Sequence, residues 1–252
     1  MGTRIAYVSG GGTGIGKAIA AALVADGMNA VLFGRREAVL EAAAKELSAA
    51  HPDSRIVYQV ADLTDPEQVR SAVAGAAGQV GESVDVIVNN AGGTVPSRPG
   101  DGTRLSTEWH ETFDLNVLTA VLLTNEAVSR LRRPGGRIVT VSSVAALRGS
   151  GGGPYGPAKA ALHAWNYDLA RNLGKEGITA NVVAPGFVPD TEFWADGLSD
   201  NLYRSRVADT LVGRAGTPED VAGAVRWLAS PDTSWVTGQI IQVNGGTVLG
   251  RG

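Results

Sequence analysis

The chain contains no cysteine, only three histidines and few aromatic residues. The missing cysteine excludes disulfides, thiol catalysis and thiolate metal sites. The histidines, His51, His110 and His163, follow no spacing typical of metal ligands, so we expect no metal site. No apolar run approaches the roughly 20 residues that a membrane-spanning helix needs. The sequence therefore gives no sign of a redox thiol, a metal site or a membrane-spanning helix.

The charge balance and the first residues narrow the expected partners further. A formal net charge of −3 over 252 residues gives no reason to expect nucleic acid or an anionic membrane as a partner. The N-terminus enters an apolar segment, Ile5–Val8, at once and lacks the long apolar region of a signal peptide. We therefore expect a cytoplasmic protein that acts on a small-molecule substrate.

Short apolar runs alternate with longer helical patterns along the chain. The runs predict strands at Ile5–Val8, Ala30–Phe33, Arg55–Val60, Val84–Val88, Arg137–Val141, Ile178–Val183 and Gln239–Val243. The patterns predict helices at Gly14–Ala25, Glu37–Ala50, Pro66–Ala77, Ser106–Arg132 (with Ser106 as N-cap), Pro154–Leu173 and Pro218–Ala229. Such alternation predicts an α/β Rossmann fold: a doubly wound parallel sheet of about seven strands with helices on both faces. No linker splits the chain, so we expect one domain over residues 1–252.

Two segments rich in glycine and proline, Gly92–Gly102 and Gly149–Pro157, each follow the C-terminal end of a predicted strand. Ligands bind outside those ends in doubly wound sheets. We expect substrate-binding loops at about 93–105, 144–155 and 186–211. The aromatic residues of the third loop are open to two interpretations, a lid that offers apolar surface to the substrate or ordinary packing.

The turn between the first strand and the first helix is rich in glycine, from Ser9 to Gly16. A pyrophosphate needs close backbone N–H groups, which side chains would obstruct, and a helix N-terminus adds partial positive charge. The glycines are spaced Gly-x-x-x-Gly-x-Gly rather than in the more familiar Gly-x-Gly-x-x-Gly order. The turn predicts dinucleotide binding, with contacts from Gly10, Gly12, Thr13, Gly14, Ile15 and Gly16.

The end of the second strand indicates which dinucleotide binds. Here the chain reads Gly34-Arg35-Arg36, where a cofactor without a 2′-phosphate usually meets an acid. Two arginines at a helix N-terminus oppose the helix dipole, and a bound phosphate would relieve that conflict. We therefore expect NADP(H), with NAD(H) possible. Further cofactor contacts are expected after the third and fourth strands, from Asp62, Leu63, Asn89, Asn90, Ala91 and Gly92.

Tyr155 and Lys159 lie four residues apart in a predicted helix and so share one face. A tyrosine of pKa about 10 needs roughly 4 kcal/mol to titrate near neutrality. An ammonium about 4 Å away supplies about that much at an effective dielectric near 20. Together with the glycine turn, the pair therefore predicts hydride transfer between a nicotinamide and a carbonyl or alcohol, with Tyr155 as general acid/base at a lowered pKa.

Taken in order, these motifs resemble the short-chain dehydrogenase/reductase family over nearly the whole chain. The ordered set is the glycine turn, Asp62, Asn89-Asn90-Ala91-Gly92, Asn116, Ser142-Ser143, Tyr155-x-x-x-Lys159, Pro185-Gly186, Gly238-Gln239 and Gly245-Gly246. The resemblance implies a one-domain Rossmann fold and a homo-oligomer, a tetramer or a dimer. It also implies the catalytic set Asn116, Ser143, Tyr155 and Lys159, with Asn116 holding water in a proton relay to Lys159. At the nicotinamide end it implies contacts from Pro185, Gly186, Val188 and Thr191.

The chain departs from the family pattern at three positions. The family usually has thirteen residues from the catalytic serine to the tyrosine, which points to Ser142. The strand Arg137–Val141 and the distance from Asn116 favour Ser143, which we choose. Ser9 replaces a common threonine and keeps its hydroxyl. Thr13 stands where many NADP-using members carry a basic residue, which makes Arg35 the main phosphate contact and leaves NAD open.

The sequence favours an NADP-preferring carbonyl reductase or alcohol dehydrogenase. The runner-up is 3-oxoacyl thioester reduction, because the chain is similar to acyl-carrier-protein reductases of this family. An acidic carrier would need an electropositive entrance, to which Arg130, Arg132 and Arg133 could contribute, whereas Gly174–Gly177 is charge-neutral. Sugar, steroid and polyketide ketones stay open as substrates. A non-catalytic nucleotide sensor is the alternative of another class, and the Tyr155/Lys159 pair argues against it.

Overall fold

The computed structural model describes residues 3–95, 102–194 and 197–250. Within them, seven parallel strands form one sheet in the order β3-β2-β1-β4-β5-β6-β7. The strands are β1 (Ile5–Ser9), β2 (Asn29–Gly34), β3 (Ile56–Val60), β4 (Val86–Asn89), β5 (Arg137–Val141), β6 (Thr179–Pro185) and β7 (Ile240–Val243). The predicted doubly wound sheet is confirmed. Its winding reverses between β1 and β4, which is where such sheets bind ligands.

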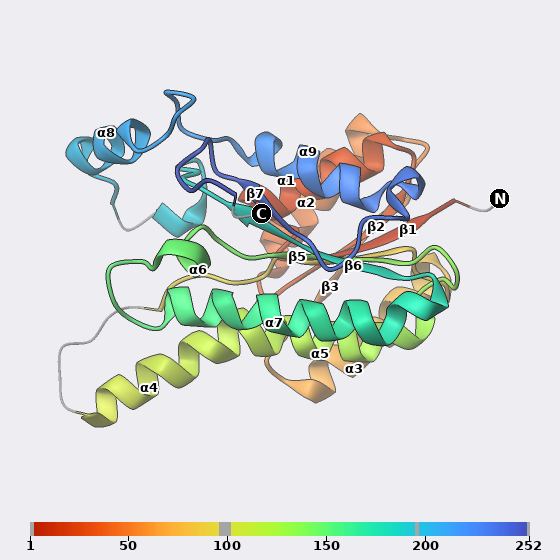
Figure 1. The fold of residues 1–252 in the computed structure, drawn as a ribbon. Coiled ribbons are helices and arrows are strands. Elements are labelled where there is room, and N and C mark those ends of the chain that lie inside the picture. Colours follow the sequence, from red (N-terminus) through yellow and green to blue (C-terminus); the bar gives the residue numbers. More distant parts are fainter. Residues whose placement is uncertain (1–2, 96–101, 195–196, 251–252) are drawn as a thin grey trace.

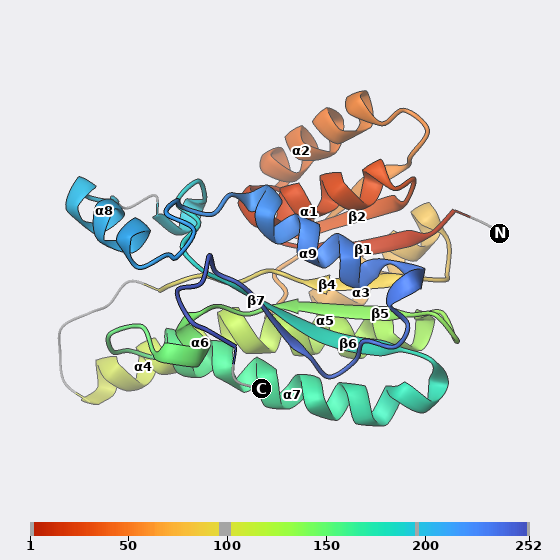
Figure 2. The ribbon, with the colours of Figure 1, turned by 45° about the horizontal axis from the view of Figure 1, so that its top comes forward.

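Helices cover both faces of the sheet (Figures 1 and 2). One face carries α1 (Gly14–Ala25), α2 (Glu37–Ala50) and α9 (Pro218–Ala229). The other carries α3 (Pro66–Val80), α5 (Thr119–Ala127) and α7 (Tyr155–Leu173). Three more helices, α4 (Gly102–Phe113), α6 (Ala145–Arg148) and α8 (Asp200–Ala208), lie toward the side where the strands end, at the left of Figure 1. No helix within the described ranges is both long and apolar enough to cross a bilayer.

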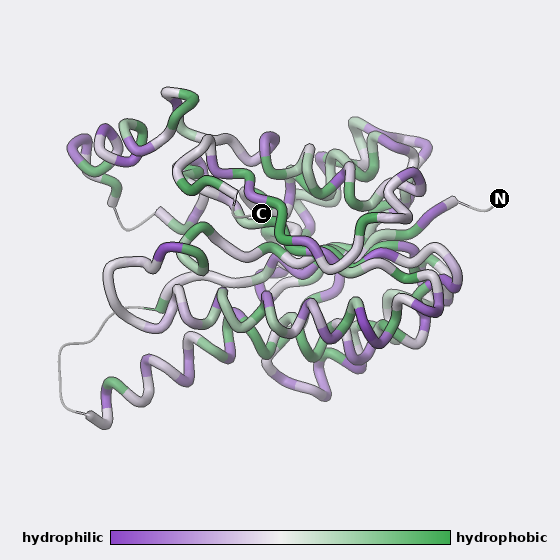
Figure 3. The backbone as a smooth tube through the Cα atoms, in the orientation of Figure 1, coloured by the Kyte–Doolittle hydropathy of each residue, from purple (hydrophilic) through white to green (hydrophobic). Residues whose placement is uncertain are grey.

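The inner strands are largely apolar because both of their faces are buried. In β1, Ala6 and Val8 pack into the core under α1 and α9, whereas Ile5 and Tyr7 pack into the core under α3 and α5. The hydropathy colouring of Figure 3 is accordingly apolar along the strands and polar on the outer turns of α4 and α8. This pattern is typical of a parallel sheet enclosed by two helical layers.

The predicted long helix Ser106–Arg132 is wrong in its bounds. Helix α4 already begins at Gly102, so Ser106 lies inside it and is not an N-cap. A π-helical turn, η1 (Asp114–Leu118), then separates α4 from α5. The helix α5 ends at Ala127 and is followed by a 3₁₀ turn, η2 (Val128–Arg130). Periodicity along the sequence does not mark a π turn, because one extra residue shifts the helical register only locally.

The three predicted loops are partly helical. The first overlaps the start of α4, and its residues 96–101 lie outside the described residues. The second contains α6, and the third contains the 3₁₀ turn η4 (Glu192–Trp194) and the whole of α8. Their described parts lie at the carboxyl edge of the sheet (Figure 2). The prediction treated these short helices as loop, and substrate binding by the three segments stays a prediction.

Candidate active site

The glycine turn after β1 forms a cradle that side chains would fill. Gly10 and Gly14 have φ values of 63° and 48°, in the left-handed region that favours glycine. A Cβ on Gly16 would lie 2.0 Å from the carbonyl oxygen of Gly10, so no other residue fits there without a backbone shift. Thr13 is the N-cap of α1 but makes no side-chain capping bond, and the first turn of α1 carries no acid. The cradle therefore offers backbone N–H groups and partial positive charge to an anion.

The Ser9 hydroxyl ties this cradle to the end of β4. Its oxygen accepts hydrogen bonds from the N–H groups of Asn90 and Ala91, each at 2.9 Å, and it donates to the Val88 carbonyl at 3.3 Å. The Asn90 amide in turn donates to the Ser9 carbonyl at 3.0 Å. The hydroxyl that Ser9 shares with threonine thus joins the two strands that flank the reversal of the sheet.

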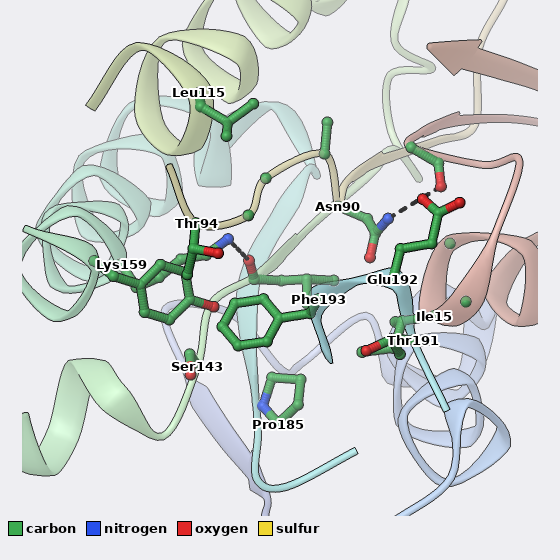
Figure 4. Close-up of a pocket in the computed structure, with 18 of the residues that line it drawn as sticks. Ile15, Asn90, Thr94, Leu115, Ser143, Lys159, Pro185, Thr191, Glu192 and Phe193 are labelled. Carbon is green, nitrogen blue, oxygen red and sulfur yellow. Dashed lines mark hydrogen bonds between the residues drawn. The ribbon is translucent and has the colours of Figure 1, made fainter. Parts of the chain in front are cut away.

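A cavity of about 920 Å³ extends from the cradle along the carboxyl edge. The predicted residues that line it are Gly10, Gly12, Thr13, Gly14, Ile15, Gly16, Arg35, Arg36, Asp62, Leu63, Asn90, Ala91, Gly92, Ser143, Tyr155, Lys159, Pro185, Gly186, Val188 and Thr191. Figure 4 shows Ile15 and Thr191 toward one end and Ser143 and Lys159 toward the other. Residues from segments far apart in the sequence therefore share one cavity.

Asn89 was predicted to contact the cofactor, but it lies beneath the cavity rather than in its wall. The side chain is buried, and its amide donates to the hydroxyls of Thr124 at 2.8 Å and Thr140 at 3.4 Å. The alternation of side chains along a strand explains the difference, because Asn89 points under the sheet and toward α5. Asn89 therefore braces the sheet below the site.

Tyr155 and Lys159 meet at the substrate end of the cavity. Tyr155 begins α7, and the ammonium nitrogen of Lys159 lies 6.0 Å from the centroid of its ring. Lys159 is buried and donates to the Val141 carbonyl at 3.1 Å, at the end of β5. The Ser143 side chain lies in the same cavity, close enough to the Tyr155 phenol to oppose the rise in its pKa. A phenol, a hydroxyl and an ammonium are thus brought together over the end of one strand.

The two adjacent serines face different partners. Ser142 is buried, and its hydroxyl donates to the Lys159 carbonyl at 3.0 Å and lies 2.8 Å from Nε2 of His163. Ser143 lines the cavity beside Tyr155. This geometry supports Ser143, rather than Ser142, as the serine that contacts a substrate.

The pKa of Tyr155 departs from the direction predicted from the sequence. Burial raises the pKa of Tyr155 to about 12, and the hydrogen bond from Ser143 only partly opposes this. Burial also lowers the pKa of Lys159 to about 8. The predicted lowering is therefore wrong for this arrangement of side chains, because the cost of burying a phenolate outweighs the contribution of Ser143. At neutral pH Tyr155 is a protonated phenol, which suits a proton donor.

Asn116 lies behind the cavity, in the π turn η1. Its amide nitrogen donates to the carbonyls of Gly93 at 2.8 Å and Thr112 at 2.9 Å, and its oxygen accepts from the Gly93 N–H at 3.0 Å. A Cβ on Gly92 would lie 2.7 Å from that oxygen and 2.9 Å from the Lys159 ammonium nitrogen. Asn116 and Lys159 therefore flank Gly92 closely, whereas the water relay between them stays a prediction.

The short turn η4 covers the cavity, with aromatic rings on one side and a carboxylate on the other. The Phe193 ring lies 5.3 Å from that of Tyr155 and 5.2 Å from that of Trp194. Phe187 packs edge-on against Trp194 and Tyr203. These aromatic side chains pack together, and Phe193 also lines the cavity, whereas their role as a lid over a substrate stays a prediction. Glu192 was not among the predicted site residues, because no sequence motif marks it.

The two arginines after β2 differ in their partners. Arg36 is the N-cap of α2 without a side-chain capping bond, and it pairs with Glu192 at 2.6 Å. Arg35 is exposed and lines the cavity, and within the described part of the chain it makes no ion pair. A guanidinium is therefore available at the place where the sequence predicts a 2′-phosphate.

Comparison with known proteins agrees with this geometry. A family model described as Enoyl-(Acyl carrier protein) reductase matches residues 10–248. A 3-oxoacyl-[acyl-carrier-protein] reductase FabG of Chlamydia muridarum is 36% identical over 247 residues, which cover 96% of each chain.

Solved structures are also similar to this chain over nearly its whole length. A blue fluorescent protein from a metagenomic library, in complex with NADPH, has a TM-score of 0.87 at 36% identity and covers 98% of each chain. A variant of the actinorhodin polyketide ketoreductase with NADPH has a TM-score of 0.85 at 27% identity and covers 97% of each chain. The chain therefore belongs to the short-chain dehydrogenase/reductase family of NAD(P)-dependent oxidoreductases that act on CH–OH and C=O groups.

Proposed function

We propose that the protein is an NADP(H)-dependent carbonyl reductase, or the corresponding alcohol dehydrogenase, with Tyr155 as general acid/base. One observation carries the proposal: Tyr155, Ser143 and Lys159 line the cavity that contains the glycine cradle, and the Lys159 ammonium nitrogen lies 6.0 Å from the centroid of the Tyr155 ring. The cofactor is supported by the NADPH complexes of two similar structures and by the arginines after β2.

The residues of the cavity fit a dinucleotide. The cradle and the uncapped start of α1 would hold the pyrophosphate, and Arg35 would hold the 2′-phosphate. Lys159 would anchor the nicotinamide ribose, and Thr191 would contact the carboxamide. The bound nicotinamide supplies or accepts the hydride.

The chain's own residues account for the proton. Ser143 and Tyr155 would both donate hydrogen bonds to the carbonyl oxygen of the substrate, and Tyr155 would transfer its proton to the alkoxide as it forms. The Lys159 ammonium would stabilise the resulting phenolate, for which a buried site otherwise carries a large penalty. Asn116 would complete the path that returns a proton to Lys159.

The pH dependence of reduction should follow Lys159. Its pKa of about 8 lies far below that of Tyr155, about 12, so Lys159 loses its proton first as the pH rises. Since the proposed mechanism needs both groups protonated, kcat/KM for ketone reduction should be constant from pH 6 to 7 and fall above about pH 8. In Lys159→Arg, whose side chain stays charged, the fall should move to higher pH. A wild-type profile that rises through this range would contradict the assignment.

The substrate class is a ketone, with 3-oxoacyl thioesters as the second candidate. The thioester candidate is supported by the similarity to a 3-oxoacyl-[acyl-carrier-protein] reductase. The arginines predicted to form an entrance for an acidic carrier do not favour it. Arg130, Arg132 and Arg133 pair with Glu82, Asp85 and Glu176, respectively. They also lie near the amino-terminal ends of β4 and β5, at the edge opposite the cavity.

An absorbance assay tests both the activity and the cofactor. NADPH oxidation would be followed with a panel of ketones and of 3-oxoacyl thioesters, and turnover of at least one member is expected.

In the same assay, Arg35→Asp should raise KM for NADPH about tenfold or more, because one charge-assisted contact is lost and a repulsive charge is added. The KM for NADH should change much less. Equal effects on the two cofactors would refute the role of Arg35.

Two coarser expectations accompany the activity. By resemblance to the family we infer a homo-oligomer, a tetramer or a dimer, and a cytoplasmic location. Sedimentation of the purified chain would test the first of these.

A further inference from the structure

The carboxylate of Glu192 lies between two groups that the cofactor would also use. One of its oxygens, Oε2, is 2.6 Å from the Arg36 guanidinium and accepts a hydrogen bond from the Thr13 hydroxyl at 3.2 Å. Thr13 is the N-cap of α1, and Arg36 is the N-cap of α2. A single oxygen therefore bridges the starts of two helices, both of which attract negative charge.

This bridge lies over the glycine cradle. Glu192 lines the same cavity as the cradle, and its neighbour Thr191 lies so near Gly14 that a Cβ there would be 3.3 Å from Thr191 Cγ2. The hydrogen bonds from Arg36 and Thr13 hold the pKa of Glu192 below its ordinary value, so it is ionised at neutral pH. A negative charge of the chain thus lies where the phosphates of a dinucleotide would lie (Figure 4).

We propose that Glu192 is an internal anion that competes with the phosphates of NADP(H) for Arg36 and the start of α1, and so determines cofactor affinity and selectivity. This inference rests on the proposed function. A carboxylate and a phosphate that share one guanidinium repel each other, so a bound phosphate displaces Glu192. NAD(H) lacks the 2′-phosphate, so it competes with Glu192 only for Thr13 and the start of α1.

The competition also reaches the catalytic end of the cavity. Phe193 follows Glu192 in η4, and its ring contacts that of Tyr155. Figure 4 shows Glu192 and Phe193 pointing to opposite ends of the pocket. If displacement of Glu192 shifted this turn, Phe193 would move away from Tyr155 and the phenol would become more open to a substrate.

Calorimetric binding to the purified protein tests the proposal without turnover. In Glu192→Gln the Kd for NADPH should fall about three- to tenfold, because a competitor is removed, whereas the Kd for NADH should fall about twofold or less. The Kd for adenosine 2′,5′-bisphosphate, which carries the 2′-phosphate, should fall as the Kd for NADPH does. The Kd for AMP, which lacks that phosphate, should change as little as the Kd for NADH. Glu46→Gln is the matched control: it removes the carboxylate of an equally short exposed pair, with Lys17 at 2.6 Å, outside the cavity lining.

A double-mutant cycle separates competition from a general effect of charge. In an Arg36→Gln background, Glu192→Gln should change the Kd for NADPH no more than Glu46→Gln does. Both side chains of the pair are more than half exposed, so the variants should fold, which thermal melts would verify. An unchanged or raised Kd for NADPH in Glu192→Gln would overturn this inference and leave the proposed function standing. A wild-type protein that binds neither dinucleotide would overturn the proposed function instead.

Discussion

Replacing Tyr155 by phenylalanine should lower kcat for ketone reduction by about 10²- to 10⁴-fold, the usual contribution of a positioned general acid. The variant keeps the ring that packs against Phe193 and loses only the hydroxyl, in the cavity that Ser143 also lines. The Kd for NADPH should therefore change little, because the cradle and Arg35 are untouched. Stopped-flow or steady-state NADPH absorbance gives kcat, and calorimetry gives the Kd.

Tyr167→Phe is the matched control for this substitution. Tyr167 lies on the same helix, α7, but its side chain is exposed and outside the cavity lining. Its loss should leave both kcat and the Kd for NADPH unchanged. If Tyr155→Phe turned over ketones at the wild-type rate, the proposed acid would be wrong, and a protein that only binds the nucleotide would become the better interpretation.

Gly16→Ala should weaken NADPH binding about 10- to 100-fold and lower the free energy of unfolding by about 1–3 kcal/mol, the usual cost of overpacking. The added Cβ would lie 2.0 Å from the Gly10 carbonyl oxygen and 2.5 Å from the Asn90 amide nitrogen. The first neighbour is backbone and cannot rotate away, so the whole turn must move. Calorimetric binding and urea unfolding measure the two effects.

The control for Gly16→Ala is a glycine-to-alanine substitution at a helical position where the added Cβ has free space. Gly223 lies in α9, and a Cβ there would meet no atom within 4 Å. Because alanine favours a helix over glycine, Gly223→Ala should stabilise the protein by up to about 1 kcal/mol and leave NADPH binding unchanged. Equal stability and equal NADPH affinity of Gly16→Ala and the wild type would show that the cradle tolerates a side chain.

The strands and most helices could be predicted because their signals are local. The strand Arg137–Val141 and the helices Gly14–Ala25, Glu37–Ala50 and Pro218–Ala229 have the predicted bounds. Each is defined by an apolar pattern with the right period and by a glycine, proline or polar residue at its ends. The segment from Gly102 to Arg130 was predicted poorly because its π turn depends on packing around Asn116 rather than on periodicity.

The sequence by itself determined the sheet, the glycine turn and the spacing of Tyr155 and Lys159, since each depends on residues that are near one another in the chain. Tertiary structure alone decided which serine faces the phenol, that Asn89 points under the sheet, and that burial raises the pKa of Tyr155. It also brought Glu192 to Arg36, 156 residues away. These outcomes depend on burial and on contacts between distant segments, and no local pattern encodes either.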